Sequence, residues 1–260
     1  MERRSFIKNA AAVAAATIAL PVAASEPAAN KKGAKEIYEW RRYYFQDAAS
    51  MEQFHTHCRA AFVPALKRLG VGVGAFVNTG GADPLVLHLW LIWKDLAAYQ
   101  KSKDQLFLDK KFTADAAEFF AATAKKPLYK RFETFLMEGF EGFAQLVNPG
   151  KEKRFFELRI YESPNEEAGQ RKLHMFNHGE FAIFAAIDLS IVFAGEILAG
   201  PSMPGLIYML AYKDKEARDS GWANFGPHPD WKKMSADPYY ANTVSKVISG
   251  FMLPTDYSDF

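Results

Sequence analysis

The sequence predicts an α+β fold, in which two tandem ferredoxin-like modules pack sheet to sheet as a barrel-like pseudo-dimer. Three observations support this prediction. Turn-forming residues at 147–153 divide the chain beyond residue 35 into halves of similar length. Short motifs recur between the halves, and both halves have the same order of apolar strands and helices.

The recurring motifs follow one another in the same order in both halves. Their offsets are 118, 119 and 122 residues, so the spacing drifts only slightly along the chain. The matches join residues 39–43 to 157–161, residues 93–95 to 212–214, and residues 110–112 to 232–234. Three matches in order indicate an internal duplication more strongly than any one of them.

Each half is expected to contain a strand, a helix, two strands, a helix and a final strand. In the second half, strands are predicted at 154–162, 189–198, 205–212 and 245–253, and helices at 166–186 and 213–225. The first half repeats this order, with its hairpin turn at 80–84. Helices cover one face of such a sheet, so the two bare faces can pack together.

These patterns also predict boundaries along the chain. Residues 1–24 are a twin-arginine signal peptide and residues 25–35 a flexible leader. The first module spans residues 36–146, a linker spans 147–153, and the second module spans 154–260.

The first residues have the three parts of an export signal in order. Arg3 and Arg4 precede Ser-Phe-Ile-Lys, which resembles the twin-arginine motif. A short alanine-rich stretch follows, with small residues at 22–24 for a signal peptidase. The apolar stretch is too short for a permanent membrane anchor. We therefore expect a periplasmic or secreted protein, exported through the twin-arginine route.

Cysteine content and charge agree with this expectation. Cys58 is the only cysteine, which suits a chain that folds in a reducing cytoplasm before export. The formal net charge of +2 comes from residues 1–24, which leaves the remainder near neutral. Near neutrality provides no electrostatic reason to expect nucleic acid as a partner.

Segments in both halves carry a family resemblance, at residues 86–90, 93–95, 158–161, 206–212, 222–225, 229–231 and 253–258. Together they resemble the NIPSNAP family, within the dimeric α/β barrel group. The resemblance implies the tandem ferredoxin-like fold, but the family has no general catalytic motif to transfer. His228 departs from the Asp that family members more often show there, so a different cap is expected at this turn.

Strand alternation separates the side chains of residues 156–161 into two faces. We expect the apolar face, at 156, 158 and 160, to pack against helices. The polar face then points into the space between the sheets, together with its counterpart in the first half and with His88. The candidate ligand-binding residues are Glu39, Arg41, Tyr43, His88, Glu157, Arg159 and Tyr161.

Two interpretations of this polar face remain open. The Glu and Arg side chains could form a structural ion-pair network that closes the barrel, because buried charges require partners. Alternatively, they could line a polar pocket for a small anionic or carbonyl-bearing ligand. His88 itself suits a satisfied core residue or a site residue.

Other chemistry has little support. His174 and His178 share a helix face, and His55 and His57 lie in a similar place in the first half, but neither pair supplies a third ligand. We therefore expect no metal site. The sequence has no phosphate-binding glycine loop, no G-x-S-x-G elbow, no paired C-x-x-C and no H-E-x-x-H.

The sequence thus leaves three classes of function. The preferred one is an exported small-molecule-binding or interaction module with a polar pocket between the sheets. The alternative is a dimeric α/β barrel enzyme, an oxidoreductase or isomerase that is cofactor-free or haem-using. The third is a structural pseudo-dimer that assembles into a homo-oligomer through exposed aromatic residues. Catalytic residues and cofactors are unknown from the sequence.

Overall fold

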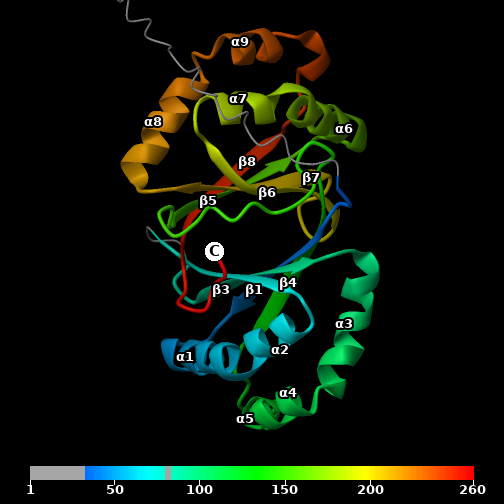
Figure 1. The fold of residues 1–260 in the computed structure, drawn as a ribbon, viewed down its shortest axis with the longest axis vertical. Helices are drawn as coiled ribbons and strands as arrows, with labels where there is room; N and C mark the ends of the chain where they lie inside the picture. The colour runs from blue at the N-terminus through cyan, green and yellow to red at the C-terminus, as the bar shows by residue number, and fades with distance from the viewer. Residues whose placement is uncertain (1–32, 80–82) are drawn as a thin grey trace, which may run out of the picture.

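The computed structural model describes residues 33–79 and 83–260. Eight strands form one closed barrel in the middle of the molecule, and helices cover it at both ends of the long axis (Figure 1). The predicted signal peptide lies outside the described residues, as does most of the predicted leader. The predicted hairpin turn at 80–84 is described only in part.

The first module has the predicted order of elements, with its second helical region divided into three short helices. It comprises β1 (Ile37–Tyr44), α1 (Ala48–His57), the π-helical turn η1 (Cys58–Phe62), α2 (Val63–Arg68), β2 (Gly72–Asn78), β3 (Val86–Trp93), α3 (Leu96–Leu108), α4 (Lys110–Asp115), α5 (Ala117–Phe120) and β4 (Arg131–Gly139).

The second module repeats this order. It comprises β5 (Phe155–Glu162), α6 (Glu166–Met175), the π-helical turn η2 (Phe176–Glu180), α7 (Phe181–Ala186), β6 (Ser190–Ala199), β7 (Gly205–Tyr212), α8 (Lys215–Phe225), α9 (Pro229–Ser235), the 3-10 turn η3 (Pro238–Tyr240) and β8 (Lys246–Pro254). The strands predicted from alternation agree with these bounds to within one residue.

Equivalent side chains begin equivalent helices in the two modules. Asp47 and Asn165 accept a hydrogen bond from the third following backbone N–H, at the starts of α1 and α6. Asp95 and Asp214 do the same for α3 and α8. Such caps satisfy an N–H group that would otherwise lack a partner at a helix start. The shared caps explain why the helices begin at matching places.

The strand order is that of two ferredoxin-like sheets joined edge to edge. The first module contributes β4-β1-β3-β2 and the second β8-β5-β7-β6. Pairing of β2 with β8 and of β4 with β6 closes the sheets into one barrel. Closure leaves no unpaired sheet edge. The predicted pseudo-dimer is confirmed, and its sheets are also continuous through hydrogen bonds.

The register confirms the repeat at the level of single residues. Glu39 is the third residue of β1 and pairs with Leu91, while Glu157 is the third residue of β5 and pairs with Leu210. The strands β1 and β5 occupy the same place in the two sheets. Equivalent glutamates therefore lie on equivalent strands, as predicted.

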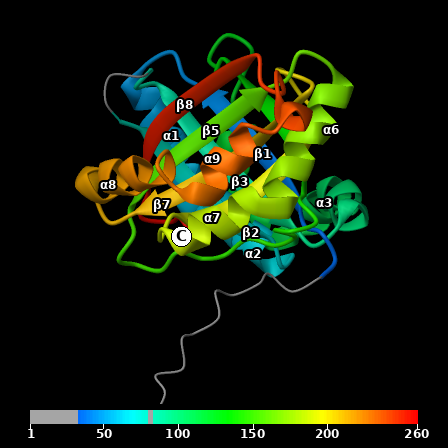
Figure 2. The ribbon, with the colours of Figure 1, turned by 90° about the horizontal axis from the view of Figure 1, so that it is seen from above.

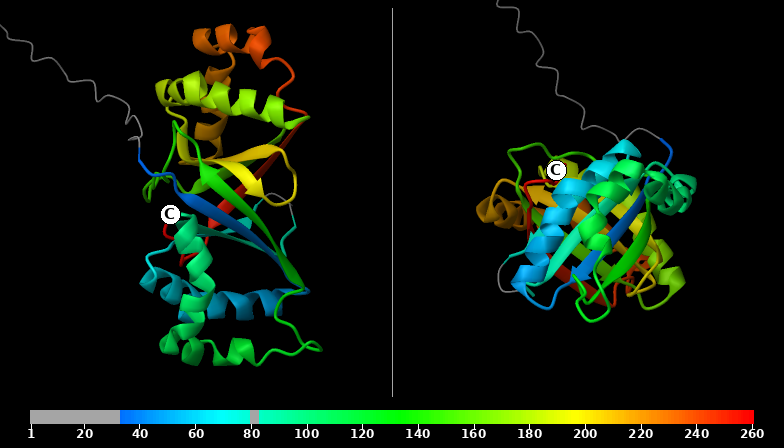
Figure 3. Two further views of the ribbon diagram at one scale, coloured as in Figure 1. Left: turned by 90° about the vertical axis from the view of Figure 1, so that its right-hand side faces the viewer. Right: turned by 90° about the horizontal axis from the view of Figure 1, so that it is seen from below.

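Three apolar clusters form the core. One fills the barrel with side chains from both modules, including Trp40, Trp90, Phe135, Phe156 and Phe193. The other two lie between each sheet and its own helices. Figure 2 shows the second module's helices over the barrel, and Figure 3 shows the first module's helices from below. Strands such as β3 and β7 therefore bury both of their faces.

A π-helical turn interrupts the first helix of each module at an equivalent place. The turns begin at Cys58 and at Phe176, which are 118 residues apart. Such turns are rare and occur often near functional sites. The sequence predicted one continuous helix over 166–186 and did not reveal this feature.

Candidate functional site

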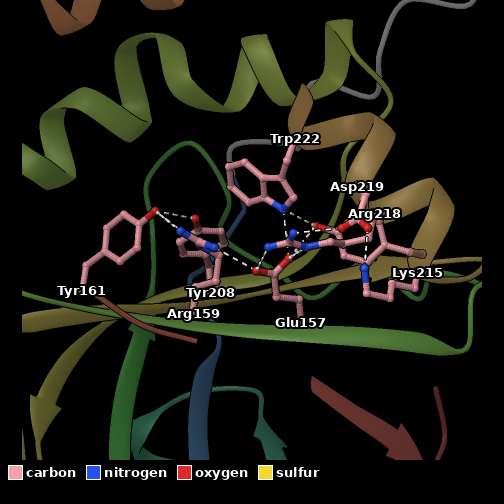
Figure 4. A network of polar contacts seen from close by, with 9 residues as sticks. Glu157, Arg159, Tyr161, Tyr208, Lys215, Arg218, Asp219 and Trp222 are labelled. Carbon is pink, nitrogen blue, oxygen red and sulfur yellow. Dashed lines mark hydrogen bonds and ion pairs between the residues drawn. The ribbon is translucent and has the colours of Figure 1, made fainter. Parts of the chain in front are cut away.

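Glu157 is the centre of a buried polar network between β5 and α8. Its carboxylate accepts hydrogen bonds from Arg159 Nη1 at 2.8 Å, from Arg218 Nη2 and Nε at 2.9 and 3.0 Å, from Trp222 Nε1 at 2.9 Å and from the Tyr212 hydroxyl at 3.1 Å. Figure 4 shows Glu157, Arg159, Arg218 and Trp222 meeting on the helix side of the sheet.

The network holds Glu157 in its charged form. Burial acts to raise the pKa of this carboxyl, but hydrogen bonds from Arg218, Trp222 and Arg159 outweigh it and hold the pKa below its ordinary value. Two guanidinium groups therefore compensate one carboxylate that has no exposed surface. All the carboxylate's hydrogen-bonding capacity is used by protein groups.

Arg159 extends the network along the sheet. Its Nη2 and Nε donate to the Tyr161 hydroxyl at 3.2 and 3.3 Å, and that hydroxyl lies 2.9 Å from the hydroxyl of Tyr208. The guanidinium also stacks over Trp222, with its central carbon 4.4 Å from the ring. Burial raises the pKa of Tyr208 well above its ordinary range, so this phenol stays protonated.

A second buried ion pair lies in the same layer. Lys172 on α6 donates to Glu180 at 2.7 Å, and both side chains are almost completely buried. The ammonium group also lies 4.7 Å from the centre of the Phe176 ring. The π-helical turn η2 separates the two charged residues along the helix, and it ends at Glu180.

The equivalent triplet of the first module makes a smaller network. Arg41 donates two hydrogen bonds to the Glu39 carboxylate, from Nε to Oε1 at 2.8 Å and from Nη2 to Oε2 at 3.0 Å. Its Nη1 donates to the Tyr43 hydroxyl at 3.3 Å. Thr134 makes a long hydrogen bond of 3.4 Å to the same carboxylate.

The first module lacks most of the polar partners found in the second. At an offset of 118, Phe54 and Phe62 stand in place of Lys172 and Glu180. The β-pairing places Leu89 opposite Arg41, where the second module has Tyr208 opposite Arg159. The two modules therefore share a fold and a Glu-Arg-Tyr triplet, but only the second surrounds its triplet with further buried polar partners.

The predicted orientation of the triplets is wrong. Phe156, Leu158 and Ile160 line the barrel interior, whereas Glu157 and Arg159 face the helices. The same inversion holds in the first module, where Tyr43 packs among residues of the helix-covered cluster. Alternation correctly separated the two faces, but both faces are buried. The polar face lies where the helices supply partners.

The predicted polar pocket between the sheets is therefore also wrong. Aromatic side chains fill that space: the Trp40 ring stacks on Trp90 at 4.9 Å and on Phe135 at 4.7 Å between ring centres. Phe76 and Phe156 meet edge to face within the same cluster. The barrel interior is thus a packed apolar core.

His88 alone among the seven candidates faces the barrel interior, as its own alternation predicted. Trp40 Nε1 donates to His88 Nδ1 at 3.2 Å, and His88 Nε2 lies 2.9 Å from Asn78 Oδ1. Because an indole nitrogen only donates, Nδ1 must accept and Nε2 must carry the proton. The structure separates His88 from both triplets and gives it two partners.

The environment of His88 favours its neutral form. Burial, and next the positive charge of Arg42, lower the pKa of His88 to about 3. A proton on Nδ1 would also point at the indole N–H of Trp40. His88 is therefore a neutral core residue at physiological pH.

A groove with a volume of about 580 Å³ lies on the helices of the first module. It runs between α1 with its π-helical turn and the α5 region. His57 lines it, stacked against Phe119 at 3.8 Å and more distantly against Phe62 at 5.9 Å between ring centres. Burial lowers the pKa of His57 to about 4, so its imidazole is neutral at physiological pH.

The histidine pairs do not form a metal centre. The rings of His174 and His178 stack face to face at 3.7 Å. Their Nδ1 atoms lie near the Tyr240 hydroxyl and the His174 carbonyl, respectively. Within residues 33–79 and 83–260, no three His, Cys, Asp or Glu side chains are placed to hold a metal ion.

Sequence reasoning missed the partners that α8 contributes. Arg218 and Trp222 lie four residues apart, so they share one helix face, and both reach Glu157. Their i, i+4 spacing after the Asp214 cap was the available signal. His228 stands where family members more often show Asp, and a different cap was expected there. The histidine supplies that cap: its Nδ1 accepts a hydrogen bond from the Asp230 backbone N–H at 3.3 Å, at the start of α9.

The fold is similar to that of two solved structures along most of the chain. A candidate monooxygenase from Lactobacillus acidophilus NCFM is 9% identical, with a TM-score of 0.57 over 85% of this chain and 94% of the other. A second candidate monooxygenase, from Fusobacterium nucleatum subsp. nucleatum, is 10% identical, with a TM-score of 0.56 over 85% and 93%. At these identities the likeness concerns the fold alone.

A family comparison points to the second half of the chain. Residues 156–259 match the NIPSNAP family. An uncharacterized NIPSNAP-like domain protein from Burkholderia xenovorans is 18% identical, with a TM-score of 0.37 over 42% of this chain and 91% of the other. No curated protein sequence matches the chain. Residues 156–259 therefore form a NIPSNAP domain, and the chain as a whole has the dimeric α/β barrel fold.

Proposed function

We propose that this chain is an exported small-molecule-binding protein, and that its ligand occupies the groove of the first module. The groove carries the proposal because its volume of about 580 Å³ lies within the usual range of roughly 300–1,000 Å³ for ligand sites. The Glu157 network does not compete for this role, since protein groups satisfy its carboxylate.

The lining of the groove indicates the chemistry of the ligand. Phe119 and the neutral His57 offer stacked aromatic surface. Three acidic side chains line the groove against one basic side chain, Lys126, and one of the three, Asp115, is paired with Lys111. Glu118 has no ion-pair partner among the described residues. An amine with an aromatic ring suits this lining better than an anion does.

A matched pair of probes tests the groove. Tyramine should raise the melting temperature of the chain by several degrees at about 100 times its Kd, whereas 4-hydroxyphenylacetate, with the opposite charge, should not. Replacing the exposed Thr56 of the lining, Thr56→Trp, should remove the tyramine effect by filling the groove. Thermal unfolding monitored by circular dichroism provides the measurement.

The control uses the smaller groove beside α8. Ser220→Trp adds the same side chain at an exposed position that lines that groove of about 280 Å³. This variant should keep the tyramine effect. An equal loss in both variants, or equal shifts from the amine and the acid, would contradict the proposed site.

Export is the second part of the proposal, and the Arg3-Arg4 motif with its apolar stretch supports it. Replacing both arginines by lysine preserves the charge but not the guanidinium groups. The precursor should then accumulate in the cytoplasm of a bacterium with a working twin-arginine pathway. Immunoblots of cell fractions check this, and unchanged export of the double variant would contradict the route.

A further inference from the structure

Three exposed apolar side chains form a patch at one end of the molecule. Phe107 and Leu108 end α3 with exposed fractions of 66% and 78%, and Phe120 ends α5 with 43%. The rings of Phe107 and Phe120 lie 5.9 Å apart. Figure 1 shows α4 and α5 at the lower end of the long axis, next to the last turn of α3. We call these three residues the α3–α5 patch.

The helix that carries most of this patch is packed weakly. Ser102 is the only fully buried residue of α3, although the helix has 13 residues. The equivalent helix α8 is tied to the sheet by Arg218 and Trp222. The chain has Tyr99 and Lys103 at the positions equivalent to them. The outer face of α3 is therefore not needed for the core and is available for another surface.

Lysines surround the patch. Lys103 precedes Phe107 by four residues and Lys101 precedes Leu108 by seven, so each pair shares a face of α3. Lys110 follows at the start of α4. None of these three lysines forms an ion pair within the described ranges. Among the nearby acidic groups, Asp109 pairs with Arg68 and Asp115 with Lys111. Asp104 on α3 and Glu118 on α5 have no ion pair within the described ranges, and the three lysines outnumber them.

We propose that the α3–α5 patch is a peripheral contact surface for an anionic lipid bilayer. Exposed Phe and Leu side chains can enter the interfacial region, while the flanking lysines meet lipid phosphates. The position of the patch at an end of the molecule lets it touch a flat surface without obstruction from the barrel (Figure 3).

Charge complementarity favours a lipid surface over a second copy of the chain. In a symmetric dimer each surface meets itself, so the lysines around one patch would face those around the other. Like charges in a contact weaken it, whereas anionic headgroups attract the same lysines. Contact of this kind needs no spanning segment. In the part of the chain that the structure describes, no helix has the length and hydrophobicity to cross a bilayer.

Vesicle co-sedimentation tests the proposal. The chain from residue 25 onward contains the whole described fold and lacks the apolar signal, which would bind lipid itself. It should bind vesicles of phosphatidylcholine and phosphatidylglycerol about tenfold or more tightly than vesicles of phosphatidylcholine alone. Phe107→Ser/Leu108→Ser should weaken binding by about tenfold or more. Lys103→Glu/Lys110→Glu should remove the preference for the anionic vesicles.

A matched control replaces two exposed leucines elsewhere, at positions that are 42% and 44% exposed, as Leu198→Ser/Leu253→Ser. This variant should bind vesicles as the unmodified chain does. Absence of binding to anionic vesicles, or unchanged binding of Phe107→Ser/Leu108→Ser, would overturn the proposal. So would a dimer in light scattering that the same patch variant dissociates, because the occupant would then be a second copy.

Discussion

Replacing Glu157 by alanine should lower the free energy of unfolding by about 3–5 kcal/mol, because removal of one partner strands buried charges. Arg159 and Arg218 would both lose the carboxylate that they share, and Trp222 and Tyr212 would lose an acceptor. Equilibrium unfolding in urea, followed by circular dichroism, measures the loss. We expect the midpoint to fall without a change in the slope.

Two further variants identify the cause of this loss. Glu39→Ala removes the equivalent carboxylate of the first module, which binds one guanidinium instead of two, so the loss should be smaller. Glu157→Gln with Arg159→Met removes both charges of one pair and should recover much of the stability. A loss below about 1 kcal/mol for Glu157→Ala, as is usual for exposed ion pairs, would contradict a structural role for the network.

Lowering the pH from 7 to 4 should remove about 3 kcal/mol of stability through His88 alone, from the linkage of its pKa shift to folding. The pKa of His88 is about 3 in the folded chain, against about 6.5 in an unfolded one. Between these values the unfolded state binds the extra proton. The stability is therefore fully present above pH 6.5 and is lost as the pH falls towards 3.

The comparison of the unmodified chain with His88→Gln isolates this residue. Glutamine can accept from Trp40 and donate to Asn78 as histidine does, but it does not titrate. Carboxyl groups and His57 titrate in both proteins, so their contributions cancel in the difference. Urea unfolding at pH 7, 6, 5 and 4 should show the stability of the unmodified chain falling relative to that of His88→Gln, by about 3 kcal/mol in total. A constant difference would mean that His88 is not held neutral.

The sequence by itself determined the duplication and the order of elements. Local signals suffice for these features: alternation marks strands, and Asp or Asn caps mark helix starts at Asp47, Asp95, Asn165 and Asp214. The repeated Glu-Arg-Tyr triplet also placed Glu39 and Glu157 on equivalent strands. Alternation further separated each strand into its two faces, and that division was confirmed.

Only the tertiary structure decided which face each triplet occupies. When both faces of a strand are buried, period-two alternation separates the faces but does not show which one points into the barrel and which one points to the helices. The choice depends on Arg218 and Trp222, which lie 61 and 65 residues from Glu157 in the sequence. Whether a buried charge is tolerated on a face depends on such distant partners. The barrel interior lacks them and is filled by aromatic rings instead.

The difference between the modules was likewise a tertiary result. Phe62 and Glu180 occupy equivalent positions in the two modules, but the role of each side chain can be inferred only when the fold shows what surrounds it. Glu180 is buried because η2 brings it to Lys172, and Phe62 instead lies beside the Arg41 guanidinium, 5.8 Å from ring centre to carbon. A π-helical turn depends on packing around the helix as well as on its own residues. For that reason the groove at His57 could not be located from the sequence.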